Sequence, residues 1–156
     1  MSIKRYQPYR SKNLIYKTTS IDSYRLSKVK SKNTKPEIIL RKELWSKGLR
    51  YRKNVLDLPG KPDIVFKKLK LAIFVDGEFW HGYNWSEAKN KFQTNKEYWI
   101  PKIENNIERD IKNNIELKEK GYIVVRLWES EIKKNLFDCV RRILNIIDTI
   151  KNNENL

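Results

Sequence analysis

The sequence predicts an α/β sandwich in which helices flank a central mixed sheet of four or more strands. Periodic segments follow one another as helix, three strands, helix, strand and helix. Such an order is typical of a mixed sheet with a crossover helix. The third strand, at residues 71–75, is apolar on both faces, as a central strand is. The fourth, at residues 122–127, follows a helix, so we expect it to run parallel to a neighbour.

The first helix is expected to begin at Thr34. This residue is suited to the N-cap and Pro36 to the first turn, while Glu37 stands three residues after Thr34, as in a capping box. An apolar stripe continues through residues 38–47, and Gly48 is a natural C-terminal stop.

Three strands are expected next. Residues 49–55 alternate apolar and polar side chains, as a half-buried strand does. A loop rich in Pro and Gly at 58–62 leads to a second strand at 63–66. A hairpin turn at 67–70 joins it to the third strand.

The rest of the domain is expected to be mostly helical. Residues 82–97 are polar and predict a surface loop. Residues 98–120 predict a long amphipathic helix, ended by Gly121, on the basis of apolar side chains at four-residue spacing: Trp99, Ile103, Ile107 and Ile111. Residues 131–151 predict one last helix, with apolar side chains at helical spacing: Ile132, Leu136, Val140, Ile143, Ile147 and Ile150.

Length and composition indicate one domain. The 156 residues suit one core, which we place at residues 21–151, after a basic arm at 1–20 and before a tail at 152–156. The single cysteine, Cys139, excludes an internal disulfide and fits a reducing compartment. No apolar run approaches the ~20 residues of a membrane span. We therefore expect a cytoplasmic, nucleoid-associated protein with no membrane partner.

The charge is concentrated at one end of the chain. The formal net charge is +15, and residues 1–53 hold 16 basic and 3 acidic side chains. The remaining 103 residues hold 18 basic and 16 acidic side chains. Such segregation favours a polyanionic partner, above all nucleic acid, over the alternative of an evenly solvated basic surface.

Two aspartates are predicted to meet at the ends of adjacent strands. Asp63 follows Pro62 at the head of one strand, and Asp76 ends the next one after a single hairpin. Neighbouring carboxylates repel each other unless a cation or a proton intervenes. Mg²⁺ suits them because it takes few protein oxygens and leaves positions for water and phosphate. The alternative is that each aspartate only caps a turn.

Two aromatic residues and the only histidine follow Asp76. His81 can take a proton from water or protonate a leaving oxygen near neutral pH. Phe79 and Trp80 lie past the strand end, where a role in the core is less natural. The alternatives are a histidine satisfied in the core and a small hydrophobic cluster beneath a loop.

The long helix carries a polar stripe beside its isoleucines. Its members are spaced at i, i+4, i+7 and i+8: Lys102, Asn106, Arg109 and Asp110. A solvated helix surface is the alternative. For Glu37 the capping box alone is a sufficient explanation.

Six segments of the chain occur together in one order: S-K-x-K-S-K-N-T-K-P-E, G-L-R-Y-R, L-P-G-K-P-D, F-V-D-G-x-F-W-H-G, Y-W-x-x-K-I-x-x-N-x-x-R-D and G-Y-x-V-x-R-x-W-E. By these segments the chain resembles the very short patch repair (Vsr) endonucleases, bacterial nucleases of the PD-(D/E)XK superfamily that nick DNA at T:G mismatches. The resemblance spans roughly residues 24–147.

The resemblance implies a role for several positions. Asp63 matches the metal-binding aspartate, and Val75 matches a residue whose main-chain carbonyl reaches the metal. His81 matches the catalytic histidine. Glu37 and Asp110 match acids that support the site. Three aromatics match residues that wedge into DNA beside the mismatch: Phe79, Trp80 and Trp99.

Two departures from the family pattern affect the expected site. Asp76 stands where the family commonly has a histidine, so it is a candidate metal ligand. The positions of the family's zinc ligands hold poor ligands: Glu78, Tyr83, Trp85 and Ser130. We therefore expect no structural zinc, with aromatic packing in its place.

Taken together, the sequence predicts a Mg²⁺-dependent endonuclease that nicks double-stranded DNA, with His81 moving a proton. Its DNA contacts are expected from the aromatics, from the polar stripe of the long helix and from basic residues near the N-terminus: Arg25, Lys28, Lys30 and Lys32. We expect a monomer that meets mismatch-repair proteins. Two alternatives stay open: a restriction or homing-type endonuclease on the same scaffold, and a non-catalytic DNA-binding module.

Overall fold

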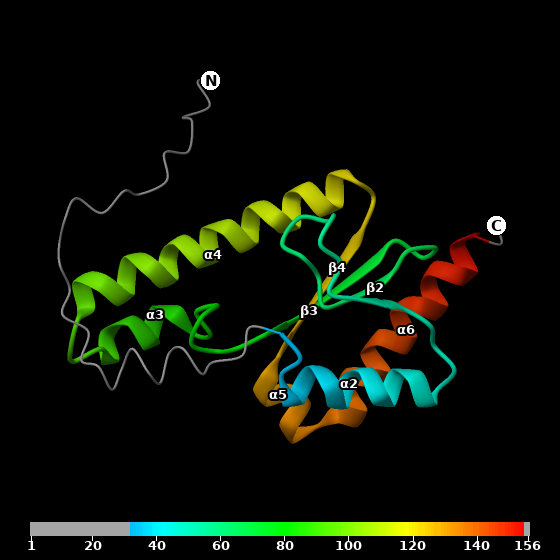
Figure 1. Ribbon diagram of the computed structural model, residues 1–156, viewed down its shortest axis with the longest axis horizontal. Coiled ribbons are helices and arrows are strands. Elements are labelled where there is room, and N and C mark those ends of the chain that lie inside the picture. The colour runs from blue at the N-terminus through cyan, green and yellow to red at the C-terminus, as the bar shows by residue number, and fades with distance from the viewer. Residues whose placement is uncertain (1–31, 155–156) are drawn as a thin grey trace.

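A computed structural model gives the structure of the protein for residues 32–154. It confirms the α/β sandwich with a mixed sheet (Figure 1). The elements in order are α2 (Lys35–Ser46), β1 (Arg52–Lys53), β2 (Ile64–Phe66), β3 (Leu71–Asp76), α3 (Trp85–Ala88), η1 (Lys89–Lys91), α4 (Lys96–Glu119), β4 (Ile123–Trp128), α5 (Glu129–Lys134) and α6 (Leu136–Glu154).

The sheet has four strands in the order β1-β2-β3-β4. β1 and β2 pair antiparallel, as do β2 and β3, whereas β3 and β4 pair parallel through the crossover helix α4. β3 is therefore central, and all six of its residues are buried. The register places Asp76, the last residue of β3, opposite Trp128 of β4.

Helices cover both faces of the sheet. Figure 1 shows α4 along one face and α2, α5 and α6 on the other. Alternate side chains of β3 serve the two faces: Ile73 and Val75 belong to the larger core cluster, and Phe74 packs in a smaller one with Leu117 of α4. By the same alternation Asp76 faces α4. The catalytic candidates of β3 and α4 therefore share a face.

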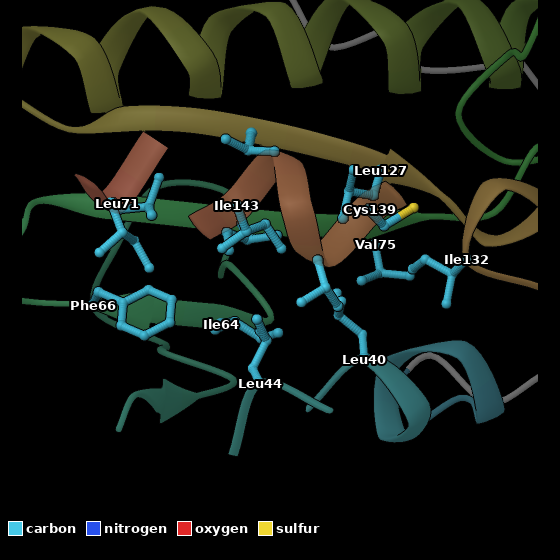
Figure 2. Packing of buried hydrophobic residues seen from close by; sticks show 14 residues of the cluster. Leu40, Leu44, Ile64, Phe66, Leu71, Val75, Leu127, Ile132, Cys139 and Ile143 are labelled. Atoms are coloured by element: carbon cyan, nitrogen blue, oxygen red, sulfur yellow. The ribbon is translucent and has the colours of Figure 1, made fainter. Parts of the chain in front are cut away.

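The larger core cluster joins α2 and α6 to the sheet. Figure 2 shows this packing, which includes Leu40, Leu44, Ile64, Phe66, Leu71, Val75, Leu127, Ile132, Cys139 and Ile143. Helix α2 starts as predicted, because the Thr34 hydroxyl accepts a hydrogen bond from the main-chain N–H of Glu37. The apolar spacing of the C-terminal segment is also confirmed, since Val140, Ile143 and Ile147 are almost fully buried.

The first strand is shorter than predicted. β1 covers two residues instead of 49–55. Asn54 has φ 49°, a left-handed conformation that interrupts the extended backbone. Pairing nevertheless continues beyond the strand, because the main-chain N–H groups of Asn54 and Val55 donate to the carbonyls of Asp63 and Pro62.

Two of the predicted boundaries are wrong. Residues 82–97 form the short helices α3 and η1 instead of a loop alone. The predicted single helix at 131–151 is divided into α5 and α6 at Asn135, which has φ −148° and ψ 74°. The Asn135 side-chain oxygen accepts a hydrogen bond from the main-chain N–H of Asp138, so an asparagine that competes for main-chain donors ends one helix and begins the next.

The apolar stripe predicted on α4 is only partly correct. Ile103 is fully buried, but Ile111 is 55% exposed. A four-residue step overshoots one helical turn by about 40°, so two such steps rotate a side chain well away from the core. The second buried anchor of α4 is Leu117, fourteen residues after Ile103 and close to a whole number of turns.

The predicted arm at 1–20 and the DNA contacts Arg25, Lys28 and Lys30 lie outside the described residues. Within residues 32–154, no helix is long and apolar enough to cross a membrane.

Candidate active site

A cleft of about 750 Å³ lies where β2 and β3 meet the loop that follows β3 and the side of α4. Its lining brings together acids, a histidine and aromatics from distant parts of the sequence. They include Glu37, Asp63, Val75, Asp76, Phe79, Trp80, His81, Asn106 and Arg109. The strand ends that the sequence pattern singled out therefore open into one cavity.

Asp63 is a buried carboxylate of the cleft with a single main-chain partner. Its Oδ2 accepts a hydrogen bond from the main-chain N–H of Val75 at 2.8 Å. The pKa of Asp63 is raised from 3.8 to about 6, chiefly by burial and also by the charges of Glu37 and Asp76, although this N–H and the charge of Arg41 lower it. Among residues 32–154 no ion pair reaches Asp63. It is therefore an anionic position that a bound cation would stabilise.

Asp76 is held differently, although it ends the adjacent strand. It is 3% exposed. Arg126 Nη1 donates to both of its oxygens, at 3.0 Å to Oδ1 and 2.7 Å to Oδ2. The predicted juxtaposition of Asp63 and Asp76 in one cleft is present, but Asp76 already has a cation as its partner.

His81 is oriented by Asp110 of α4. The His81 Nδ1 lies 2.6 Å from Asp110 Oδ2 and 3.7 Å from Asp76 Oδ1. An ionised carboxylate can only accept, so the proton of the pair belongs on Nδ1 and the lone pair of the neutral ring on Nε2. Burial on its own lowers the pKa of His81, but the hydrogen bond to Asp110 and the charge of Asp76 raise it above its usual value.

The Asp110 carboxyl is kept ionised by the same arrangement. Its burial raises the pKa, yet the hydrogen bond with His81 and the charge of Arg126 bring it below its usual value. An aspartate–histidine pair of this geometry can present the imidazole to a reacting water in a fixed orientation.

Glu37 combines a structural position with a place in the cleft. Its Oε2 accepts from the main-chain N–H of Asn33 at 2.9 Å, and its Oε1 accepts from the Thr34 hydroxyl at 3.2 Å. Arg41 Nη2 lies 3.9 Å from Oε2. The expected capping box is therefore formed only in part, because Glu37 accepts from the N–H of Asn33 and not from that of the N-cap Thr34. The charge of Glu37 also raises the pKa of Asp63.

Aromatic rings line the cleft beyond the histidine. Phe79 meets Trp80 edge to face at 5.0 Å between centroids and Trp99 at 5.4 Å, and Trp80 and Trp99 lie 5.9 Å apart. Phe92 extends the cluster at 6.2 Å from Phe79. We call Phe79, Trp80, Phe92 and Trp99 the aromatic wall. Phe79 is 46% exposed, which shows that the wall presents apolar surface to solvent.

The polar stripe of α4 divides between the wall and the cleft. Lys102 Nζ lies within 5.0 to 5.6 Å of the ring centroids of Tyr98, Trp80 and Trp99. Asn106 Nδ2 donates to the Trp80 carbonyl at 3.1 Å. Arg109 is exposed at the cleft, and so is Lys32, the one predicted N-terminal contact within the described residues.

The four residues that stand at the family's zinc-ligand positions make other contacts: Glu78, Tyr83, Trp85 and Ser130. Glu78 Oε1 accepts from the main-chain N–H of Ser130 at 2.7 Å. Tyr83 packs edge to face on Trp128 at 5.1 Å, and Trp85 packs on Phe92 at 6.0 Å. In residues 32–154 no group of three or more His, Cys, Asp or Glu side chains is arranged to hold a metal ion.

Comparison with known proteins now identifies the family. A sequence model described as DNA mismatch endonuclease Vsr matches residues 16–87. "Type II nicking enzyme V.NmeDIP" of Neisseria meningitidis serogroup C is 50% identical over 114 residues, which are 73% of this chain and 77% of the relative. The chain belongs to the Vsr DNA mismatch endonuclease family. It is a DNA endonuclease with the PD-(D/E)XK fold, and the resemblance stated from the sequence is confirmed.

Other Vsr-family relatives cover similar shares of the chain. "Type II nicking enzyme V.HpaIIP" of Haemophilus parainfluenzae is 50% identical over 106 residues, 68% of this chain and 75% of the relative. "DNA mismatch endonuclease Vsr" of Escherichia coli strain K12 is 33% identical over 105 residues, 67% of each chain.

Three residues of this Vsr-family site were missed from the sequence. Arg126 interrupts the apolar strand β4 with a charge, and that interruption was the available signal. Asn114, whose Oδ1 accepts a hydrogen bond from Arg126 Nε, gave no signal, since a polar residue on a long helix is ordinary. Phe92 lies in a polar segment whose short helices were not predicted.

Proposed function

We propose that this protein nicks double-stranded DNA at T:G mismatches in very short patch repair, with Mg²⁺ as its cofactor. One observation carries the proposal. Asp63, a carboxylate with no ion-pair partner among residues 32–154, shares a cleft with His81, which Asp110 orients, and with Phe79 and Trp80 of the aromatic wall.

The chemistry of the donors suits Mg²⁺. This ion is held by one or two carboxylates and completes its shell with water and substrate phosphate oxygens. Asp63 and the main-chain carbonyl of Val75 would hold it, and when bound it would polarise the scissile phosphate and lower the pKa of a water. The raised pKa of Asp63 supports this assignment, because burial and the charges of Glu37 and Asp76 disfavour its carboxylate form, which a bound cation would stabilise.

His81 is proposed to accept the proton of the attacking water through Nε2. Asp110 holds the Nδ1 proton and so leaves the Nε2 lone pair available in the neutral ring. The negative charge of Glu37, at the start of α2, raises the pKa of Asp63. We propose that the products are a 5′-phosphate and a 3′-hydroxyl.

The aromatic wall is proposed to select the mismatch. Side chains that enter between base steps must unstack them, at a cost of a few kcal/mol that is smallest for a mismatched base. Phe79 is exposed enough to enter the duplex, whereas Trp80 and Trp99 support it at its sides. Lys102 adds a positive charge over the same rings.

A nicking assay on paired duplexes tests the proposal. Each strand of a T:G duplex and of its T:A counterpart carries a different end label, and cleavage is followed with Mg²⁺ and with EDTA. We expect one labelled strand of the T:G duplex to be cut, only with Mg²⁺, and at least roughly tenfold faster than the matched duplex, the factor given by an unstacking difference of about 1.4 kcal/mol. Asp63→Asn should not cut either duplex.

The alternative of a matched-site restriction or homing-type enzyme predicts a different pattern. It would cut both strands, and both duplexes equally, which would end the repair assignment. The names of the Vsr-type relatives, which are nicking enzymes, support cutting of one strand. We also propose that the protein is a monomer, that it is cytoplasmic and associated with the nucleoid, and that it interacts with mismatch-repair proteins.

A further inference from the structure

We propose that Arg126 is a positioning residue of the nuclease site, where it holds Asp76 and Asp110 against the same nitrogen of the His81 ring. Asp76 then serves to orient the histidine and does not bind the metal ion. The inference rests on the function proposed above and deepens it. It assigns a role to Asp76, which from the sequence was a candidate metal ligand.

A single guanidinium bridges the end of β3 and the middle of α4. Arg126 pairs with Phe74 in the parallel register and thus lies two pairs before Asp76, on the same face of the sheet. Its Nη1 donates to both oxygens of Asp76, and its Nη2 lies 3.5 Å from Asp110 Oδ1. One guanidinium therefore lies within ion-pair distance of both carboxylates, through hydrogen bonds to Asp76 and a longer approach to Asp110.

Both carboxylates approach His81 from the side of Nδ1. Asp110 Oδ2 lies 2.6 Å from Nδ1 and Asp76 Oδ1 lies 3.7 Å from it. Two carboxylates this close to one nitrogen would repel each other. The charge of Arg126 between them offsets this repulsion.

Arg126 is itself fixed in place. Its Nε donates to Asn114 Oδ1 at 3.1 Å, and its guanidinium lies 4.2 Å from the centroid of the Phe74 ring. Its side chain is 20% exposed. A guanidinium with stacking and hydrogen-bonded neighbours is pre-organised, unlike a surface arginine that samples many rotamers.

The same contacts argue against Asp76 as a metal ligand. Asp76 is 3% exposed, and both of its oxygens accept from Arg126. A divalent ion would have to displace this charge-assisted pair or share its oxygens with a cation. At Asp63 the main-chain N–H of Val75 engages one oxygen, and no ion pair from the described residues competes. The cation therefore belongs to Asp63.

The first test reads the histidine directly. His81 is the only histidine, so ¹⁵N spectra of the untagged, metal-free protein report its ring without assignment. At a pH where the ring is neutral, we expect the Nδ1–H form in the wild type and in the control variant Arg142→Gln. Arg142 lies on α6, away from His81, and its Nη1 is 3.3 Å from Oε1 of Glu131 on α5. Arg126→Gln should show a mixture of both ring tautomers.

The second test separates positioning from metal binding. Arg126→Gln should lower kcat roughly 10–100-fold with KM for DNA nearly unchanged, and Arg126→Lys should restore part of the loss. Asp76→Asn should leave the half-saturating Mg²⁺ concentration within about threefold of wild type, because loss of a ligand would shift it by roughly tenfold or more. A larger shift, or a wild-type spectrum for Arg126→Gln, would overturn the proposal.

A folding failure would not leave the question open. In Arg126→Gln the repulsion between Asp76 and Asp110 has no cation to offset it, so Asp110 should move away from Nδ1. The double variant Asp76→Asn/Arg126→Gln removes this repulsion, so it should fold, as judged by circular dichroism, and its neutral His81 ring should return to the Nδ1–H form. Mixed tautomers in the folded double variant would contradict the inference. If the wild type never nicks DNA with Mg²⁺, the proposed function fails, whereas the spectra still decide the role of Arg126.

Discussion

Asp63 and Asp76 are carboxylates at the ends of neighbouring strands, yet their partners make them chemically different. Asp76 is neutralised by Arg126 at 2.7 Å. Asp63 receives one main-chain hydrogen bond and has a pKa raised to about 6 by burial and by neighbouring acids. Within one cleft, the first is suited to hold a side chain and the second to hold a cation.

The raised pKa of Asp63 predicts a metal-free protein that is destabilised by its own site. The folded state binds the proton of Asp63 more tightly than the unfolded state does. This contribution to stability is therefore complete below about pH 4 and is lost as the pH rises through about 6. Asp63→Asn should abolish nicking but increase the free energy of unfolding at pH 7.5 by up to about 3 kcal/mol, the value of a two-unit shift.

Urea denaturation in EDTA at several pH values measures this effect. The stability difference between variant and wild type should grow from pH 4 to pH 7 and then level off. Added Mg²⁺ should stabilise the wild type and not the variant. A stability difference that is the same at every pH would contradict the assignment of the shift to Asp63.

Asp63, Asp76 and His81 could be proposed from the sequence because the two aspartates stand at strand ends and the histidine is the only one. Glu37 and Asp110 were proposed from the family resemblance. Arg126 was not found, since its partners are far away in the chain: Asp76 is 50 residues earlier. Periodicity describes which face a side chain occupies but not which residue lies opposite in a parallel pair. The contact depends on the register of β3 with β4, which only the folded chain defines.

At the scale of elements, the loop after β3 is fixed to α4 and to α5. Gly82 has φ 68°, and a Cβ at this residue would lie 2.4 Å from Ile107 Cδ1. Glu78 reaches the start of α5 through the main-chain N–H of Ser130. The loop that carries Phe79, Trp80 and His81 is thus held at two points, by the close approach of Gly82 to α4 and by the hydrogen bond of Glu78 to α5.

Gly82→Ala is expected to loosen this anchor. The left-handed φ costs an alanine about 1 kcal/mol, and the overlap with Ile107 adds about 1–3 kcal/mol. We expect a lower free energy of unfolding and slower nicking. Gly48→Ala is a matched control, since Gly48 has φ 81° but nothing within 4 Å of the added Cβ.

The overlap can be relieved without restoring the glycine. Ile107→Val removes Cδ1, so Gly82→Ala/Ile107→Val should recover part of the stability and rate, measured by thermal unfolding and by the nicking assay. If Gly82→Ala costs no more than Gly48→Ala, the loop does not depend on the close approach to α4.

The order of elements could be predicted because amphipathic periodicity survives tertiary packing over long segments. The last helix was not divided in that prediction, since its apolar spacing runs across Asn135 without interruption. The break depends on one side chain that accepts from the Asp138 N–H. Local competition for main-chain donors is invisible to a pattern of hydrophobic residues.

At the scale of the whole molecule, an acidic cleft is embedded in a strongly basic chain. The net charge is +15, and most of the excess precedes residue 54. Such a distribution attracts the phosphate backbone as a whole, while the acids of the cleft hold a cation at the point of cleavage. Affinity and chemistry are therefore supplied by different parts of the sequence.

Removal of residues 2–20 should weaken DNA binding without changing mismatch preference. This segment holds five basic and no acidic side chains. Backbone contacts carry no base information, and each releases counterions, so log K against log salt should become less steep by up to about 4.5. Fluorescence polarisation in EDTA between 50 and 200 mM salt, roughly the range over which such contacts are lost, measures the slope on T:G and T:A duplexes.

The opposite end of the chain provides the control for this truncation. Removal of residues 152–156 deletes one acidic and no basic side chain, so binding should be unchanged or slightly tighter. If the arm contacts only phosphates, both duplexes lose affinity by the same factor, and the aromatic wall still separates them in the nicking assay. A loss confined to the T:G duplex would instead place part of the mismatch recognition in residues 2–20, because a sequence-independent contact cannot distinguish two duplexes of equal charge.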